Sequence, residues 1–495
     1  MTERRRTPMT DRAAQPGGGS IAGFGPPGGG GSRISRKDFL VGAARLAVGA
    51  AATAAVAPAL AACGKSPSSS APTSGPTVIK KGKQVTLTYY FGANAQEAQV
   101  RQKIFNQFMA KNPDIKIVNQ LDGTNHLQKL NTELAGGNAP DLMMSWELDY
   151  SAYAKKGVYM DLHEFIKNDS EFQNTVMPQE YPAVLEMFSY GGKLWVLPEQ
   201  VTDVILFYNK QHLKDAGLKM PTSWGDAGWT WDKFTGYAKK LTQTAGGRVN
   251  RYGYADMWGF PLTSANVIAV ANGGDWFTQP VSPKPGSSNL ASKNISDAIQ
   301  WYADLTNVDH ASAPSSAVTS QPGNQLFMTG KASMGIVGHW FYPAFSTAQG
   351  LEFDVAPIPI GPRGGTHSKT NIGGTGISIS SKTKYPEECW RFVKYWAGLS
   401  GQQVIAKEGL WVPALKNVGQ SAAYNSSNGA MAHAQLFTEV LREGNVYSLP
   451  ISAAWPDFTI PWTNTLTDIW QGKKSAKADL PGLDSTVNAD LKKFA

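Results

Sequence analysis

Aromatic and polar side chains stand together at several points of this 495-residue sequence, and each group directly follows a stretch with the pattern of a β-strand. A flat ring can contact the apolar C–H face of a ligand, whereas carboxylates, amides and hydroxyls bond to its polar edge. Ligands of α/β proteins bind at the carboxyl ends of strands, so these positions are the first candidates for a binding site. They are Asn94, Gln96, Trp146, Glu147, Asp149, Gln200, Thr202, Asp203 and Trp340.

Other patterns that could do chemistry do not complete a known motif. His163-Glu164 lacks the second histidine of a zinc-protease helix, and the sequence contains no aspartate-rich calcium loop. The stretch Gly373-Gly374-Thr375-Gly376 resembles a phosphate-binding loop. It precedes a strand pattern rather than a helix, so we expect a hinge or a turn there. The sequence therefore predicts no metal site, no cofactor and no catalytic residue.

The elements that must position the candidates alternate between strand and helix. Strand patterns cover residues 84–91, 114–118, 139–146, 204–209, 331–338, 353–360 and 376–380. Helix patterns cover residues 96–112, 126–137, 210–218, 230–242, 296–305 and 386–399. Thr230 suits a helix N-cap, Pro386 suits the first helical position, and Pro113 would end a helix. Strands that alternate with helices predict an α/β fold with a parallel sheet.

Residues 1–62 have the order of an export signal rather than of a fold element. A segment rich in Gly, Pro and Arg is followed by a basic flank, and the 17 residues from Leu46 to Ala62 are mostly alanine. That stretch is short and only weakly apolar for a transmembrane helix. Ser35 to Leu40, "SRKDFL", resembles the twin-arginine export motif with Lys37 in place of the second arginine, so the export route stays open.

Leu60 to Cys63, "LAAC", resembles a bacterial lipobox, in which the cysteine is lipidated and becomes the new N-terminus. Residues 63–83 then read as a flexible linker, because Gly64 to Thr77 consists of Ser, Pro, Thr, Gly and Ala with one Lys. Two acyl chains would hold such a tether stably on a membrane. We therefore expect Cys63 to anchor the protein on the outer face of the cytoplasmic membrane.

The net charge of +8 does not indicate nucleic-acid binding, because its excess lies in the export signal. Residues 1–62 hold eight of the 46 Lys and Arg residues and three of the 38 acidic ones. The remaining chain contains no basic block that could serve as an electrostatic footprint for nucleic acid. Besides Cys63 the sequence has one other cysteine, Cys389. It shares a helical face with Phe392, Val393 and Trp396, which predicts a buried structural thiol.

Residues 84–495 resemble the carbohydrate-type extracellular solute-binding proteins of ABC importers, the group around maltose-binding protein. The resemblance is carried by "FNQFMAKNPDIKI", "LNTELAGGNAPDL", "YGGKLWVLPEQVTDVILFYNKQHLKDAGL", "FMTGKASMGIVGHW" and "GGTGISISSKTKYPEECWRFVKYW" in this order. It implies the two-lobe periplasmic-binding-protein or Venus-flytrap fold, with hinge strands and a central ligand cleft. The implied lobes are residues 84–201 with 356–415, and residues 202–355 with 416–495.

The resemblance also implies roles for individual residues. In the family the position after "APDL" often supplies a ring and a carboxylate, which matches Trp146 and Glu147, and the "GxW" pattern at Trp340 stacks on sugar. Family positions that face the cleft further suggest Trp258, Trp411 and Trp455. The implied function is capture of a sugar by a monomeric lipoprotein that passes it to an ABC permease.

Two other functions are compatible with the same residues. A secreted glycoside hydrolase would need two opposed carboxylates, and Glu147 and Asp203 are the pair that could meet across a cleft. The same fold could instead bind a phosphorylated polyol, a peptide or a siderophore. A phosphate ligand would require an arginine, and none of the candidate segments contains one.

Overall fold

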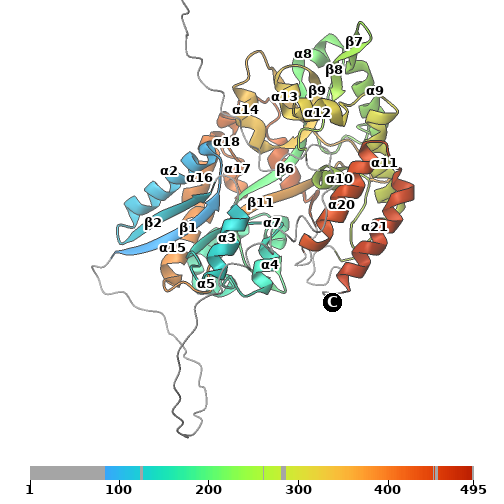
Figure 1. The fold of residues 1–495 in the computed structure, drawn as a ribbon. Coiled ribbons are helices and arrows are strands. Elements are labelled where there is room, and N and C mark those ends of the chain that lie inside the picture. Colours follow the sequence, from blue (N-terminus) through green and yellow to red (C-terminus); the bar gives the residue numbers. More distant parts are fainter. Residues whose placement is uncertain are drawn as a thin grey trace, which may run out of the picture.

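The computed structural model describes residues 84–122, 126–259, 261–279, 286–449, 451 and 455–492. The predicted export signal, Cys63 and the predicted linker lie outside the described residues. Figure 1 shows two groups of elements, one around β1 and β2 and the other around β7, β8 and β9, with β6 and β11 running between them.

The strands are β1 (Val85–Gly92), β2 (Ile115–Asp122), β3 (Leu142–Trp146), β4 (Ser189–Tyr190), β5 (Lys193–Leu194), β6 (Leu197–Asn209), β7 (Gln243–Ala245), β8 (Arg248–Tyr254), β9 (Ala332–Gly338), β10 (Phe353–Ala356), β11 (Thr370–Ile379) and β12 (Val446–Ser448). The α-helices of the first half of the chain are α2 (Ala95–Lys111), α3 (His126–Ala135), α4 (Tyr150–Lys155), α5 (His163–Asn168), α6 (Ser170–Thr175), α7 (Pro182–Met187), α8 (Lys210–Asp215) and α9 (Trp231–Leu241).

The α-helices of the second half are α10 (Pro261–Ala271), α11 (Lys293–Asn307), α12 (Ser315–Ser320), α13 (Gly323–Met328), α14 (Tyr342–Ser346), α15 (Pro386–Ala397), α16 (Leu399–Glu408), α17 (Lys416–Gly419), α18 (Ala422–Ser427), α19 (Leu436–Glu443), α20 (Trp455–Trp470) and α21 (Ala476–Leu491). Two short 3₁₀ helices, η1 (Met177–Gln179) and η2 (His339–Phe341), complete the set.

The main sheet is mixed, which corrects the predicted parallel sheet. Its order is β2-β1-β3-β11-β6-β9-β8-β7, with β10 beside β6 and β12 beside β11. β1 pairs in parallel with β2 and β3, and β8 pairs in parallel with β9, as strands joined by helical crossovers do. β11 and β6 run antiparallel to each other and to their outer neighbours β3 and β9. The parallel pattern therefore holds for β2-β1-β3 and for β8-β9. It fails where the two long strands cross between them and at the edge strand β7, which pairs antiparallel with β8.

β6 changes its pairing partner halfway along its length. Residues 197–203 pair with β11, whereas residues 204–208 pair with β9 and residues 206–209 also pair with β10. The lobe boundary expected between residues 201 and 202 lies inside this strand. A strand that belongs to both ends of a sheet is suited to act as a hinge, because a small change in its backbone angles reorients one end against the other.

Most predicted elements are confirmed, with shifted ends. The Thr230 side chain caps α9 and Pro386 occupies the first turn of α15, as predicted. α11 begins at Lys293 rather than at residue 296, and β10 ends at Ala356 rather than at residue 360. The glycine-rich stretch 373–376 is neither a turn nor a segment before a strand, because it lies inside β11.

The Cys389 side chain has no exposed surface, which confirms the prediction of a buried thiol. Its burial raises the pKa of the thiol well above the usual range. Since the thiolate is the reactive form of cysteine, this side chain is chemically inert in the folded protein.

Arg101 of α2 forms a buried ion pair with Glu199 of β6. The guanidinium contacts both carboxylate oxygens, at 2.5 Å and 2.7 Å, and the two side chains are 2% and 0% exposed. Tyr89 and Thr375 donate hydrogen bonds to the same carboxylate, at 2.9 Å and 2.5 Å. The rings of Phe91, Trp396 and Trp411 surround the guanidinium carbon at 5.1–5.4 Å. The pair thus ties α2, β1, β6 and β11 together.

The substitution Arg101→Met should destabilise the protein by about 3–5 kcal/mol, because it leaves the Glu199 carboxylate buried without a cation. Chemical denaturation would measure the free energy of unfolding. Lys103→Met is a matched control on the same helix, since it breaks the exposed Lys103–Glu408 pair of 2.6 Å and should cost less than about 1 kcal/mol. Equal losses from the two substitutions would contradict the role assigned to Arg101.

Candidate functional site

The candidate site lies where β6 changes partner, because the register there brings both ends of the sheet together. Thr202 is paired with Gly373 of β11, and Val204 is paired with Gly338 at the end of β9. Two residues of a strand span about 6.6 Å. Gly373 of β11 and Gly338 at the end of β9 therefore lie on opposite sides of β6, beside strand positions that are two residues apart. We call this region the hinge site.

Glu147 lies over the glycines of β11. Its Oε2 accepts a hydrogen bond of 3.1 Å from the backbone N–H of Gly374. A Cβ atom at position 373 would lie 2.6 Å from Glu147 Oε1 and 3.2 Å from Thr202 Oγ1. Only glycine at position 373 therefore leaves room for the carboxylate, and it brings the polar groups of Glu147 and Thr202 close together.

Trp146 and Asp149 flank Glu147 in the turn after β3, and all three are half-buried. Asp149 Oδ1 accepts a hydrogen bond of 3.3 Å from the Trp146 N–H, which fixes this turn. Burial raises the pKa of Glu147 to about 7 in spite of the Gly374 N–H. Burial, with a smaller contribution from the Glu147 carboxyl, raises the pKa of Asp149 to about 8. Near neutral pH these two carboxyls can thus donate as well as accept hydrogen bonds.

Gln200 connects the hinge site to the buried ion pair. Its Nε2 donates a hydrogen bond of 2.9 Å to Thr375 Oγ1, and Thr375 in turn donates to Glu199. Gln200 is only 5% exposed, and its Oε1 has no hydrogen-bond partner among the described residues. The amide orientation is therefore fixed by a chain of bonds that begins at Arg101.

Trp258 and Trp340 form an aromatic pair on the other side of β6. Their ring centroids are 5.4 Å apart at an angle of 57°, and both side chains are half-buried. A Cβ atom at Gly338 would lie 1.7 Å from the Trp340 ring, so this glycine is required for the ring to fold back over the end of β9. The "GxW" spacing therefore has a steric cause in this structure.

His339 anchors the backbone between Gly338 and Trp340. The imidazole is fully buried, and its two nitrogens contact Asn428 Oδ1 at 2.6 Å and the Leu410 carbonyl oxygen at 3.3 Å. Burial lowers the pKa of His339 to about 4, so the ring is neutral at physiological pH. Because His339 is held inside the protein, it fixes the backbone next to Trp340, whose own ring packs partly against the core.

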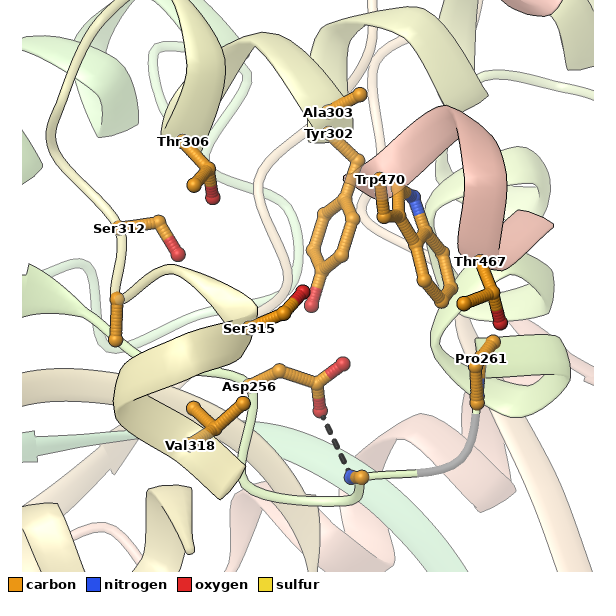
Figure 2. Close-up of a pocket in the computed structure, with 12 residues that line it drawn as sticks. Asp256, Pro261, Tyr302, Ala303, Thr306, Ser312, Ser315, Val318, Thr467 and Trp470 are labelled. Atoms are coloured by element: carbon orange, nitrogen blue, oxygen red, sulfur yellow. Dashed lines mark hydrogen bonds between the residues drawn. The ribbon is translucent and has the colours of Figure 1, made fainter. Parts of the chain in front are cut away.

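Asp256 positions Trp258 from a separate cavity. Its Oδ1 accepts the N–H groups of Trp258 and Gly259 at 2.9 Å and 3.1 Å. Figure 2 shows this carboxylate in the wall of a cavity of about 150 Å³, opposite Tyr302 of α11 and Trp470 of α20. The cavity lies among α10, α11, α12 and α20, so it is distinct from the hinge site and supports the Trp258 loop from behind.

Some predicted site residues lie elsewhere. Asn94 is the N-cap of α2, where its side chain accepts the N–H groups of Gln96 and Glu97, and Gln96 is exposed on the first turn. Trp411 is 2% exposed beneath Arg101, so its faces are covered in this structure. Asp203 has no exposed surface, because consecutive strand residues point to opposite faces and Thr202 takes the face of Glu147. Trp455 begins α20, and its side chain lies outside the described atoms.

Sequence analysis missed three residues that shape the site: Arg101, Gly373 and Asp256. Arg101 could have been noticed, because it falls on the apolar face of its helix with Ile104, Phe105 and Phe108. The role of Gly373 depends on its contact with Glu147, which is distant in sequence. The role of Asp256 depends on a hydrogen bond to Trp258 that is set by the loop conformation. No local pattern reports such contacts.

Within the ranges that the structure covers, no set of three or more His, Cys, Asp or Glu side chains is arranged to hold a metal ion. A search of the same ranges finds no helix with the length and apolar character needed to cross a bilayer. The hinge site therefore rests on rings, carboxyls, an amide and a hydroxyl.

The substitution Glu147→Gln should stabilise the protein more at pH 8.5 than at pH 5. A carboxyl whose pKa is raised in the folded state stabilises that state fully only below its unfolded pKa, and this contribution is lost as pH rises through about 7. Glutamine cannot ionise, so it escapes the loss. Thermal melts of wild type and Glu147→Gln from pH 5 to pH 8.5 would measure this difference in stability. A difference that does not change with pH, or that matches the one given by Glu186→Gln outside the site, would contradict the expectation.

Comparisons with known proteins give this arrangement a family context. Among solved structures, the fold is similar to an ABC substrate-binding protein from Listeria monocytogenes in complex with cycloalternan. The TM-score is 0.71 at 22% sequence identity, and the match covers 83% of this chain and 100% of the other. It shows the two-lobe fold of maltose-binding-protein-like solute-binding proteins.

Among relatives, the galactooligosaccharide-binding protein of Bacillus subtilis is 24% identical over 454 residues, which are 89% of this chain and 96% of that protein. The multiple sugar-binding protein of Streptococcus mutans is 24% identical over 351 residues, which are 68% of this chain and 74% of that protein. The model of the bacterial extracellular solute-binding protein family matches residues 92–403, well over half of the sequence. The chain with this hinge site belongs to the family of bacterial extracellular solute-binding proteins.

Proposed function

We propose that this protein captures a sugar or oligosaccharide outside the cytoplasm and delivers it to an ABC-type permease. One observation carries the proposal. Thr202 of β6 lies beside Glu147 over Gly373, and two residues further along β6 Val204 pairs with Gly338, from which the chain continues to Trp340. A sugar ring has apolar C–H faces and a hydroxyl edge. The Trp258–Trp340 pair suits the faces, and the carboxyl and hydroxyl groups suit the edge.

The names of the relatives support this ligand class. The relatives from Bacillus subtilis and Streptococcus mutans are a galactooligosaccharide-binding and a multiple sugar-binding protein, and the similar Listeria structure holds cycloalternan. These names do not select one sugar for this chain. The proposal therefore covers the class, and the site residues proposed for it are Trp146, Glu147, Asp149, Gln200, Thr202, Trp258 and Trp340.

The proposed mechanism is closure of two lobes about β6 and β11. The lobes are residues 84–201 with 356–415, and residues 202–355 with 416–495. A ligand that contacts Glu147 and the Trp258–Trp340 pair at once bridges the two lobes and so favours the closed arrangement. Only differential binding of this kind can shift the equilibrium, so residues of both lobes are needed in the site.

The hydrolase alternative loses the pair on which it depended. Asp203 is fully buried on the face of β6 opposite to Thr202, so it does not oppose Glu147 across a shared space. The remaining carboxyls, Glu147 and Asp149, come from one turn. A glycosidase instead places its two carboxyls on opposite sides of the scissile bond. Incubation with oligosaccharides and analysis for cleavage products would test this alternative directly.

Trp340→Ala should weaken sugar binding at least tenfold, about 1.4 kcal/mol, because it removes a flat face from the site. A thermal-shift screen of short malto- and galacto-oligosaccharides would first select a stabilising sugar. Calorimetric titration of wild type and variant with that sugar then gives the ratio of dissociation constants. No stabilising sugar in the screen would count against the proposed ligand class.

Trp301→Ala is the matched control for this experiment. Trp301 is also half-buried, but it stacks on Trp231 at 4.2 Å between α9 and α11, away from β6. Its removal should lower the melting temperature and leave the dissociation constant unchanged. Wild-type affinity of Trp340→Ala combined with a strongly lowered melting temperature would instead make Trp340 a core residue.

We also propose that the protein is a lipoprotein anchored through Cys63, on the sequence "LAAC" and the linker that follows it. Cys63→Ala should then abolish lipid attachment. The unlipidated protein should be released from cells or retained as the uncleaved precursor. Membrane fractionation with metabolic labelling by a fatty acid would measure this. A variant that stays in the membrane fraction and matures like wild type would show that Cys63 is not the anchor.

A further inference from the structure

Asp203 occupies the residue at which β6 changes partner. It is the last residue of β6 paired with β11, through Ile372, and the next residue, Val204, is the first one paired with β9. The strand is held on both sides of this point. The Val201 N–H donates to the Val412 carbonyl oxygen at 3.0 Å, and the Thr370 hydroxyl donates to the Val204 carbonyl oxygen at 2.6 Å. On β6, this residue is therefore the point at which one end of the sheet gives way to the other.

The Asp203 carboxyl is buried without compensation. The residue has 0% exposed surface, and neither carboxyl oxygen has a hydrogen-bond partner among the described residues. It forms no ion pair with a lysine or arginine of the described chain. Buried carboxyl groups normally have such partners, so this one requires an explanation.

No ion pair with a described residue compensates Asp203, although basic groups act on its neighbours. Burial is the main cause of the raised pKa of Tyr181 and of Tyr424, and the Asp203 carboxyl adds to it, so both rings lie within its electrostatic reach. The Tyr424 hydroxyl also has no partner in the described part of the chain. The other titratable groups that act on these neighbours are Glu180, Lys416, Arg442 and, at the end of β9, the neutral His339.

An ionised carboxylate in this position would be costly, since no cation and no N–H group of another described residue replaces its lost hydration. The neutral acid avoids most of that cost, and burial accordingly raises the pKa of Asp203 well above its usual range. Ionisation requires water to reach the carboxyl. Water can arrive if β6 loosens from its neighbours, among them residues 410–415, to which the Val201–Val412 hydrogen bond joins it.

We propose that Asp203 is a proton-binding site that locks the hinge: with its proton bound the crossing of β6 stays packed, and loss of the proton loosens it. The hinge strand is then more mobile at alkaline than at acidic pH. This inference does not depend on the identity of the captured solute, so it can be tested without ligand.

Hydrogen exchange of the hinge amides would test the lock. The readout is the protection factor of the amides of β6 and of residues 410–415, corrected for intrinsic exchange. In wild type it should fall by up to about tenfold per pH unit above the pKa of an exposed carboxyl, because Asp203 releases one proton when the hinge opens. In Asp203→Asn this fall should be markedly smaller, and what remains comes from other buried carboxyls such as Glu147 and Glu180. The variant should also melt at a higher temperature than wild type at pH 8.5, with the difference shrinking at pH 5.

Glu180→Gln is the matched control, because Glu180 is also buried with both oxygens unpartnered, but it lies before α7 rather than on β6. It should keep the pH dependence of the β6 amides. Residues 410–415 are left out of this comparison, because Glu180 is bridged to Leu415. The proposal is overturned if wild-type protection does not change with pH, or if Asp203→Asn changes with pH as wild type does. Asp203→Ala serves the same purpose if the asparagine variant does not fold. A failure to bind sugar would affect the proposed function and leave this result unchanged.

Discussion

The bidentate contact between Arg101 and Glu199 is the interaction on which the rest of the hinge depends. It is made in a dry core, where an ion pair holds only if its geometry and hydrogen bonds are nearly complete. The backbone carbonyl of Glu199 also accepts hydrogen bonds from Gln402 and Trp396, at 3.0 Å and 3.4 Å, so the main chain of β6 is fixed as well. Residue 199 is thus a fixed point, and movement of the lobes begins beyond it.

The same burial has opposite consequences for the other acidic residues near β6. Glu199 has a guanidinium and two hydroxyl donors, whereas Glu147 and Asp149 have one backbone N–H each and Asp203 has no donor from another residue in the described chain. Hydrogen-bond donors are therefore concentrated at the fixed point and missing where the strand must bend. The number of donors thus distinguishes the structural Glu199 from the nearby carboxyls that we expect to respond to pH or to a ligand.

Much of the fold could be predicted from periodicity, because the ends of the sheet consist of regular strand–helix units such as β1 with α2 and β9 after α13. The crossing strands could not be predicted. The sequence pattern predicted only the second half of β6. Residues 373–376 of β11 suggested a turn, because three of them are glycines and so show no alternation of apolar and polar side chains. Their strand conformation depends on pairing with residues about 170 positions away.

The candidate site could also be predicted only in part. Residues after strands were identified correctly as a group, but the face that each one takes depends on register. Thr202 and Asp203 are neighbours in sequence and have opposite environments, and only the pairing of Thr202 with Gly373 distinguishes them. Trp411 was assigned from its resemblance to family positions, yet here its ring covers Arg101, a contact that needs the tertiary structure.

The inert thiol of Cys389 has a practical consequence for spectroscopy. Residues 84–495 contain no other cysteine, and this one is both inaccessible and held as the thiol. If one cysteine is introduced on the surface of each lobe, these two residues are then the only positions in residues 84–495 that react with a maleimide dye. Pairs of dyes attached in this way would report lobe distances in single molecules, without first removing a native cysteine from the core.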